Sequence, residues 1–552
     1  MKDNPEAVVP VGFPAQAKAT VSGDSRERWS SSFIALIGLA TATAVLLRWY
    51  GLGSQSLWLD EGITFWTSGF SPRSIWHILE LDTTNPLYYF ALHYWRVCFG
   101  TSEFSLRSLS AFFATASIPL FFLTARKVLR DRWSIALAMV LYAVSFLQVW
   151  YAQEARCYAL LAFLSVGSIY WSLLCLEKRT ALRLLGLAIF LTAGLYTHNI
   201  ALFYLPGLGL LWLLYPSPRT LGARIKDGLI VGLLVLPLYL PWLSHLQGQV
   251  RRIQMGWWVA TPRPQDLLET LSILLGFDVY NLQQIFRSQF HTPRLFGFWT
   301  WAPAVLAVFL LCMWGGLLVA RPADRRKVLA LVAYCLTPVL LVFGISHISN
   351  SIYLNRAFLG SCVLLPIVLC APVAFQAGRR RMLFQAIVCL ILVGTALSAF
   401  GYLRRERRED WRGVTLYLLQ LPEKERLAVI VPDVGQILVD YYAKGMFKSY
   451  PPIEMTGLLT NYIPPDPNLE ARSLERLDQG GDMSALLAQA MASGKYKEID
   501  VVMQPGTLPV LTVPTLGYLS AHCGALERVQ FHWLEVRRCF VEPTVRNRVP
   551  LI

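Results

Sequence analysis

Residues 157–176, CYALLAFLSVGSIYWSLLCL, form one uninterrupted apolar run that holds no charged side chain. A helix needs about 20 such residues to cross the hydrocarbon core of a membrane, so this run predicts a transmembrane helix. Similar runs occur on both sides of it, at about 31–53, 105–127, 133–150, 183–198, 199–215, 227–246, 299–320, 328–347, 355–376 and 382–402. The sequence therefore predicts a polytopic α-helical membrane protein with about 11 transmembrane helices.

The composition and the charge distribution support this fold class. Of the 552 residues, 55% are apolar and only 15% are charged, a balance that a water-soluble fold of this length could not bury. The net charge of +15 does not indicate a nucleic-acid-binding protein, because most basic residues gather in short connections between apolar runs. The five basic groups are Arg126, Lys127, Arg130 and Arg132; Lys178, Arg179 and Arg183; Arg219, Arg224 and Lys226; Arg321, Arg325, Arg326 and Lys327; and Arg379, Arg380 and Arg381.

The positive-inside rule puts all five basic groups in the cytoplasm, which fixes the orientation of the other segments. Residues 1–30 are then a cytoplasmic tail, and their polar composition without an apolar period predicts disorder. Residues 31–402 form the transmembrane domain, with large outer loops at 54–104 and 247–298. Residues 86–95 are apolar but too short to span the membrane, and we interpret them as a helix lying on its outer surface.

Residues 403–552 have a different composition and predict a small C-terminal α/β domain on the outer, extracytoplasmic side. Short β-rich runs at 427–431 and 499–503 alternate with helical patterns at 434–445 and 483–494, and the last runs, near 531–536, could add strands. Its basic start at 404–408 is the one feature that favours the cytoplasm instead. Cys523 and Cys539 could pair if the domain faces an oxidising compartment.

Two adjacent carboxylates follow the first apolar run, within LWLDEG at 57–62. A low-dielectric membrane face can raise the pKa of such a group and make it a useful base. We expect Asp60 to be the base, with Glu61 as the alternative, because neighbouring carboxylates titrate as a coupled pair. Both residues could instead cap a helix in the outer loop.

Several short motifs follow one another along the chain: Arg48, LWLDE at 57–61, NPLYY at 85–89, Arg107, YAQEARCY at 151–158 and LYTH at 195–198. Their order resembles the bacterial glycosyltransferases of the GT-C superfamily, above all the family 39-like branch of protein O-mannosyltransferases and aminoarabinose transferases. The resemblance covers roughly residues 31–400. One motif departs from the family, which often has His-Pro-Pro where this chain has Asn85-Pro86-Leu87, so a metal or phosphate role for that histidine is not expected.

The resemblance implies an enzyme of the bacterial inner membrane that moves a sugar from a polyprenyl-phosphate carrier to a glycan, lipid or protein acceptor on the outer face. It assigns the base or metal contact to Asp60 and Glu61, and polar contacts from the second outer loop to Gln153, Glu154 and Arg156. Acceptor choice would then lie in the loop 247–298 and in the C-terminal domain.

The chemistry of such a transfer requires few groups. A base must take the proton of the acceptor, and cations must hold the departing phosphate, which needs no acid. Arg156 and Arg356 are candidates for a bidentate phosphate clamp, although Arg156 could merely anchor a helix end at the interface. With one base and no nucleophile, we expect direct displacement with inversion.

The remaining candidates complete the donor site or a metal site. Arg48, Gln153 and His198 are expected to contact the donor, and Glu154 the sugar or a divalent cation. Asp60 and Glu154 could hold such a cation through oxygen, but no spacing requires one, and no other cofactor is expected. A transporter or lipid-linked flippase remains the alternative function, although the predicted spans carry few charges and no internal repeat is evident. A membrane-anchored polymer-binding protein would leave the order of the motifs unexplained.

Overall fold

The computed structural model describes residues 29–129, 131–255, 259–277, 321–404, 408–421, 425–449, 454–456, 483–504 and 509–541, with residues 308, 310, 314 and 315. Almost all of the predicted cytoplasmic tail 1–30 lies outside the described residues, and so does most of the predicted span 299–320.

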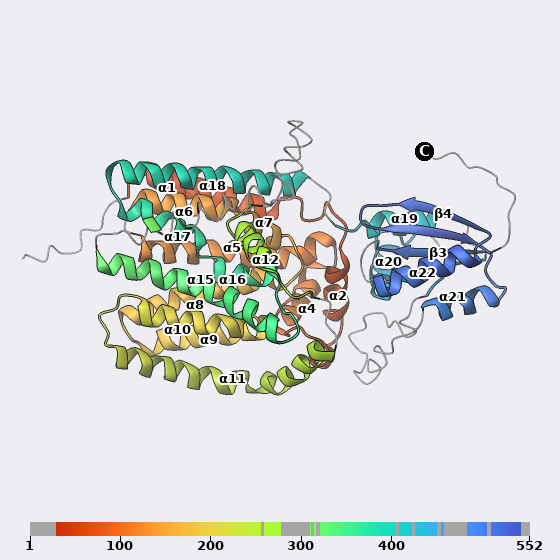
Figure 1. The fold of residues 1–552 in the computed structure, drawn as a ribbon, viewed down its shortest axis with the longest axis horizontal. Helices are drawn as coiled ribbons and strands as arrows, with labels where there is room; N and C mark the ends of the chain where they lie inside the picture. The colour runs from red at the N-terminus through yellow and green to blue at the C-terminus, as the bar shows by residue number, and fades with distance from the viewer. Residues whose placement is uncertain are drawn as a thin grey trace, which may run out of the picture.

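The described helices between residues 31 and 404 run largely side by side in a bundle (Figure 1). They are α1 (Ser31–Trp49), α5 (Glu103–Val128), α6 (Arg132–Val144), α7 (Phe146–Ala152), α8 (Tyr158–Glu177), α9 (Ala181–Thr197), α10 (Ala201–Leu214), α11 (Leu221–Met255), α15 (Pro322–Ile348), α16 (Leu359–Cys362), α17 (Leu365–Phe375) and α18 (Gly378–Arg404). Among the described residues, six helices are long and apolar enough to cross a membrane, or eight if each bent pair counts as one span. The predicted polytopic fold is confirmed, and every predicted run except 299–320 corresponds to helix.

Two of the spans are bent, and each bend lies close in the chain to polar residues. Helices α6 and α7 meet at 46°, and the pair 355–362 and α17 meets at 42°. At the first bend the N–H of Phe146 donates to Thr395 Oγ1 on α18 at 3.1 Å, so the backbone group freed by the bend is paired inside the bundle. In the chain, Glu154 lies shortly after the first bend, and Arg356 lies shortly before the second.

The described members of the five basic groups lie at one end of the bundle. Ion pairs join neighbouring helix ends there: Lys127 Nζ with Glu177 at 2.6 Å, Arg179 Nε with Asp227 at 3.2 Å, and Arg381 Nη2 with Asp131 at 2.8 Å. Helix α5 ends at this face and begins at the opposite one, beside the C-terminal domain. The basic groups that were predicted from the sequence to share one face of the membrane thus lie together in the structure.

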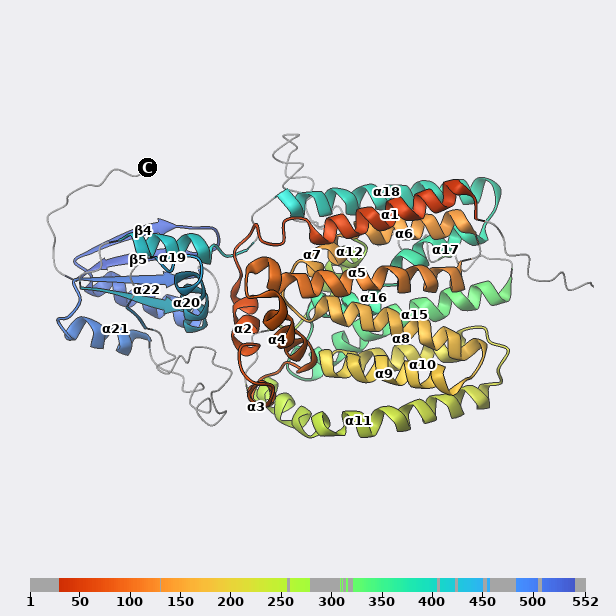
Figure 2. The ribbon, with the colours of Figure 1, turned by 180° about the vertical axis from the view of Figure 1, so that it is seen from behind.

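Three short helices cover the opposite end of the bundle: α2 (Leu59–Thr67), α3 (Pro72–Glu80) and α4 (Leu87–Phe99). Figure 2 shows them between the bundle and the C-terminal domain. Helix α4 corresponds to the interfacial helix expected near 86–95, and its length falls short of a span. Within the predicted outer loop 247–298, α11 continues to Met255 and α12 (Pro264–Leu274) follows it, while residues 278–298 lie outside the described residues.

The C-terminal domain, called the tail domain below, is the α/β unit expected from its alternating pattern. Its five-stranded sheet has the order β2-β1-β3-β5-β4, with β1 parallel to β2 and β3, and β5 antiparallel to β3 and β4. The elements are α19 (Trp411–Gln420), β1 (Arg426–Val431), α20 (Gln436–Lys444), β2 (Met455–Thr456), α21 (Met483–Ala492), β3 (Glu498–Met503), α22 (Pro509–His522), β4 (Ala525–Gln530) and β5 (Glu535–Phe540). Residues 531–534, predicted near a strand, form the turn between β4 and β5.

Alternate residues of β1 enter two different cores, as the period of a strand requires. Ala428 and Ile430 belong to the cluster with α19, α20 and the end of the bundle next to the tail domain, whereas Val429 packs with α21, β3 and α22. The first cluster also contains Leu57 and Tyr88. The tail domain therefore shares a hydrophobic core with the membrane part.

Close contacts fix the tail domain against α2 and α5. The hydroxyl of Tyr442 accepts from the N–H of Leu57 at 2.7 Å and donates to Glu103 Oε1 at 2.5 Å. A Cβ at Gly62 would lie 2.8 Å from the Leu438 side chain, so glycine allows α20 to approach α2. The start of α2 consequently lies between two domains.

Cys523 and Cys539 form a disulfide that links the residues before β4 to β5. A closed loop of this length stabilises by about 3 kcal/mol, so Cys523→Ser should make the tail domain more sensitive to limited proteolysis and to heat. Reductant should have the same effect on the wild-type protein. Cys98→Ser, which removes an exposed free thiol, is the control. Equal protease sensitivity of wild type with and without reductant would contradict this prediction.

Candidate functional site

Helix α2 directs its two carboxylates to different surroundings because adjacent residues of a helix are turned about 100° apart. The helix begins at Leu59, and the Glu61 carboxylate accepts from the N–H of Trp58 at 3.4 Å. The helix-capping interpretation thus applies to Glu61. Asp60 faces a cavity instead.

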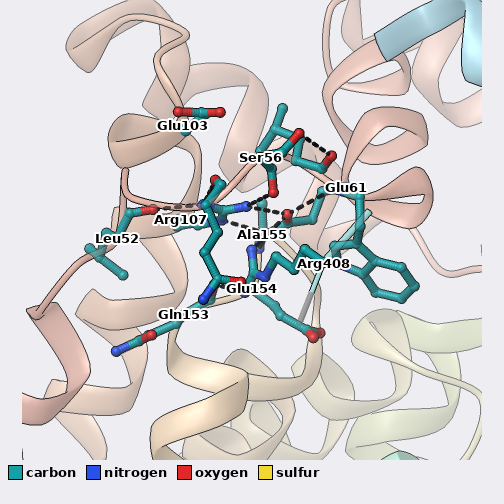
Figure 3. A network of polar contacts seen from close by, with 12 residues as sticks. Leu52, Ser56, Glu61, Glu103, Arg107, Gln153, Glu154, Ala155 and Arg408 are labelled. Carbon is teal, nitrogen blue, oxygen red and sulfur yellow. Dashed lines mark hydrogen bonds and ion pairs between the residues drawn. The ribbon is translucent and has the colours of Figure 1, made fainter. Parts of the chain in front are cut away.

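Glu61 is fully buried between two guanidinium groups, as Figure 3 shows. Its carboxylate lies 2.7 Å from Arg107 Nη2 and 2.8 Å from Arg408 Nη1, and it accepts from the N–H of Ala155 at 2.8 Å. Burial alone would raise the pKa of Glu61, but the two arginines and the Ala155 N–H lower it to about 2. A carboxylate that is ionised and fully engaged in this way is poorly suited to accept a proton, so the geometry does not support Glu61 as the alternative base.

Arg107 and Arg408 extend this network into three segments of the chain. Arg107 also donates to the carbonyls of Leu52, Gln55 and Ser56, all within 2.8 Å. Arg408 donates to the Gln153 carbonyl. The network therefore ties the first outer loop, the turn after α7 and the entry to the tail domain together.

Asp60 lies at the polar end of a cavity of about 600 Å³ and its side chain is 25% exposed. The Asp60 carboxylate is 3.3 Å from Arg356 Nη1 and 3.6 Å from Arg156 Nη2. Arg156 also donates to Thr64 Oγ1 at 3.1 Å, while the Arg356 guanidinium lies 5.7 Å from the ring centroid of Tyr158. Three residues singled out from the sequence therefore meet at one cavity.

The cavity that Asp60 lines, called the first cavity below, has a polar end and apolar walls. His198, Asn199 and Tyr89 line it near the charged residues, whereas α10, α11 and the end of α15 contribute apolar side chains, among them Phe203 and Leu246. Burial, followed by the positive charges of Arg156 and Arg356, lowers the pKa of His198 to about 3. This histidine is neutral at physiological pH, so it could contact a ligand as a neutral group and not as a cation. The cavity suits an amphiphile with an anionic head and an apolar chain.

Two other predicted donor contacts, Arg48 and Gln153, do not line the cavity that holds Asp60. Arg48 donates to the carbonyls of Ala44, Ala143 and Tyr142 within 3.2 Å. The Gln153 amide donates to the carbonyls of Leu47 and Tyr50 at 2.8 and 3.0 Å. Arg48 ties α1 to the end of α6, and Gln153 ties the residue after α7 to the end of α1, because carbonyls at helix ends need donors. A donor contact for either residue stays a prediction.

Glu154 lines a second cavity, of about 250 Å³, together with Trp58, Trp150, Tyr402, Arg408, Glu409, Gln504 and Trp533. Burial raises the pKa of Glu154 to about 7. Asp60 and Glu154 thus belong to separate cavities, and no group of three metal-ligating side chains occurs among the described residues. The two guanidinium groups beside Asp60 would also repel a divalent cation, so the structure does not support Asp60 and Glu154 as one metal site.

Two residues of the site were assigned no role there from the sequence. Arg107 occurred in the ordered motifs without an assigned contact, and Arg408 was part of the basic stretch 404–408 that favoured the cytoplasm. Its burial against Glu61 gives Arg408 a structural reason to be basic. Arg405, Glu406 and Arg407 lie outside the described residues.

Comparison with solved structures places this architecture in a known fold. No model of a protein family matches the sequence, and no curated protein sequence matches it. The crystal structure of ArnT from Cupriavidus metallidurans in the apo state is similar, with a TM-score of 0.54 and 13% identity over 92% of this chain and 98% of ArnT. The structure of the same protein bound to undecaprenyl phosphate gives a TM-score of 0.51, again at 13% identity over 92% and 98% of the two chains. The chain therefore has the fold of ArnT, and the expected architecture, a polytopic helical membrane domain followed by a small α/β domain, is confirmed.

Proposed function

We propose that this protein is a membrane glycosyltransferase that moves a sugar from a polyprenyl-phosphate carrier to an acceptor on the outer face of the bacterial inner membrane. The observation that carries the proposal is the meeting of Asp60, Arg156 and Arg356 at the polar end of a cavity with apolar walls. The similar ArnT structure bound to undecaprenyl phosphate supports this class of donor. A transporter finds no such support.

Arg156 and Arg356 hold the donor phosphate in this proposal. Both guanidinium groups already approach one carboxylate, that of Asp60, and a planar guanidinium can hold two phosphate oxygens at once. The apolar walls from α10 and α11 receive the first prenyl units. Neutral His198 adds a contact without adding charge.

Asp60 accepts the proton of the acceptor hydroxyl as its oxygen attacks the anomeric carbon. The bond from that carbon to the carrier phosphate breaks, and the phosphate leaves with the bonding pair, stabilised by the two arginines. Asp82 also lines the cavity, but its carboxylate accepts from the N–H of Thr83 at 2.6 Å and from Thr84 Oγ1 at 2.9 Å. With one available carboxylate, direct displacement inverts the anomeric centre, and a product with retained configuration would exclude this mechanism.

The outward orientation rests on two features of the chain. The five basic groups gather at the end of the bundle opposite the tail domain, which the positive-inside rule assigns to the cytoplasm. The disulfide between Cys523 and Cys539 is typical of an oxidising compartment. Both features favour a tail domain and a polar cavity end outside the cytoplasm.

The direct test of the function is label transfer by purified protein from polyprenyl-phosphate sugars to a membrane extract. Wild-type protein should consume at least one donor of a broad sugar panel and release polyprenyl phosphate. A chelator should leave the rate unchanged, because Asp60 is paired with arginines. If no donor is consumed while lipid or solute crosses the bilayer of reconstituted vesicles, the transferase proposal is wrong and the transporter alternative is favoured.

Arg156→Lys and Arg356→Lys should each raise the KM for the donor by about 10- to 100-fold, because lysine keeps the charge but loses the bidentate geometry. The KM for the acceptor should change little. Arg263→Lys is the control, since the Arg263 side chain is 71% exposed. Loss of folding in Arg156→Ala, with normal donor KM in Arg156→Lys, would favour the helix-anchor interpretation.

A further inference from the structure

The second cavity lies where the bundle meets the tail domain. Trp58 precedes α2, Trp150 and Glu154 come from α7 and the turn after it, and Trp533 comes from the β4–β5 turn. Three indole rings and two carboxyl groups, those of Glu154 and Glu409, therefore line one space of about 250 Å³. No step of the proposed transfer uses this cavity.

Two buried polar atoms in the second cavity have no partner among the described residues. Glu154 is 4% exposed, and its Oε1 accepts from Trp150 Nε1 at 2.6 Å, while its Oε2 accepts no hydrogen bond. The Nε1–H of Trp58 is also unpartnered. Buried polar groups are usually paired, and exceptions call for an explanation. Glu154 and Trp58 both line this small cavity, and the unpartnered acceptor of one and donor of the other point to a ligand that offers both kinds of hydrogen bond.

Trp533 is held at this cavity in an unusual backbone conformation. Its φ is 58°, in the left-handed region that side chains other than glycine seldom adopt, and the residue is 59% exposed. The turn is fixed by the N–H of Phe531, which donates to the Leu534 carbonyl at 2.8 Å, and by the N–H of Asp410, which donates to the His532 carbonyl at 3.1 Å. Backbone strain of this kind persists where the surroundings impose it and often marks a binding site. The turn between β4 and β5 thus presents an exposed indole at the cavity.

We infer that the second cavity binds a neutral sugar ring of a glycan acceptor, which stacks on Trp533 and exchanges hydrogen bonds with Glu154 and Trp58. This inference rests on the proposed transferase function and names the acceptor class. A sugar ring presents apolar C–H faces to indoles and hydroxyl groups that both donate and accept, which matches the lining. The N–H of Leu59 donates to Glu409 Oε2 at 3.1 Å, so the cavity borders the residue before Asp60.

The charge of the cavity favours a neutral ligand over an ammonium group. Burial raises the pKa of Glu154 to about 7, so this carboxyl group is only partly ionised at neutral pH; burial also raises the pKa of Glu409. Arg408 lines the same cavity and would repel a cation. Three tryptophans could otherwise form an aromatic cage for a quaternary ammonium group, but the positive charge of Arg408 disfavours such a ligand.

The test is glycan binding to the full-length protein in lipid nanodiscs without donor, measured by saturation-transfer NMR with cellobiose, maltose and N,N′-diacetylchitobiose. Trp533→Gly is the informative variant, because glycine suits a positive φ and should preserve or raise the melting temperature. We expect at least one sugar to receive saturation from wild type, and at least a fivefold weaker effect with Trp533→Gly. Trp533→Phe should retain part of the signal.

Trp133→Ala is the matched control, because Trp133 is an exposed tryptophan at the start of α6, at the far end of the bundle. Its saturation transfer should equal that of wild type. Equal signals from wild type and Trp533→Gly, or no signal from wild type, would overturn the inference. Donor consumption, measured separately, distinguishes the two proposals: a protein that consumes donor without binding glycan refutes only the sugar site, and the reverse result refutes only the transferase assignment.

Discussion

Asp60→Asn should lower kcat for sugar transfer by about 10²- to 10⁴-fold, the usual contribution of a positioned general base. The amide has the shape of the carboxylate but cannot accept the acceptor's proton. The protein should remain folded, because the ion pairs of Asp60 are long, at 3.3 and 3.6 Å, its side chain is 25% exposed, and Arg156 keeps its bonds to the Asp60 carbonyl and to Thr64 Oγ1. The measurement is single-turnover transfer at saturating donor, beside the melting temperature of the same preparation.

Asp82→Asn is the control for this variant, since it changes a second carboxylate of the same cavity whose oxygens are bonded within its own turn. Its rate should lie within a few-fold of wild type. If Asp60→Asn transfers sugar at the wild-type rate, or if Asp82→Asn shows the larger loss, Asp60 is not the base.

The sequence was most informative where physical constraints act over long stretches. A span must be apolar over about 20 residues, so the runs at 31–53 and 157–176 coincide with α1 and α8 to within a few residues. The order of motifs also singled out Asp60 and Arg156, and the need for a phosphate clamp added Arg356; these residues are separated by up to 296 positions and meet at one cavity. Chemical reasoning on the sequence could therefore select residues that lie close together in the fold.

The division of roles between Asp60 and Glu61 could not be found in this way. Helix α2 has buried residues on several sides because it lies between the bundle and the tail domain, so no polar face distinguishes one carboxylate from its neighbour. One of the two arginines that pair with Glu61 is Arg408, 347 residues away. It belongs to the basic stretch 404–408, whose charge in the sequence indicated a cytoplasmic location. Glu154 was assigned to the donor from its motif, yet the turn after α7 directs it into another cavity.

Glu61→Gln should destabilise the protein by about 3–5 kcal/mol, the usual cost of breaking a buried ion pair from one side. The substitution leaves Arg107 and Arg408 buried beside a neutral amide, and Arg107 is 2% exposed in the ion pair. A lower melting temperature and faster proteolysis between the bundle and the tail domain should follow. Any loss of transfer should follow the loss of folded protein.

Acid should have the same effect on the wild-type protein. The pKa of Glu61 is about 2 in the folded state, below its ordinary value of 4.5, so its stabilising contribution is complete above pH 4.5 and is lost as the pH falls toward 2. Glu61→Gln should therefore flatten the dependence of melting temperature on pH across this interval. If Glu61→Gln instead melts like wild type and loses transfer outright, Glu61 takes part in the chemistry, and the roles assigned to the two neighbouring carboxylates must be exchanged.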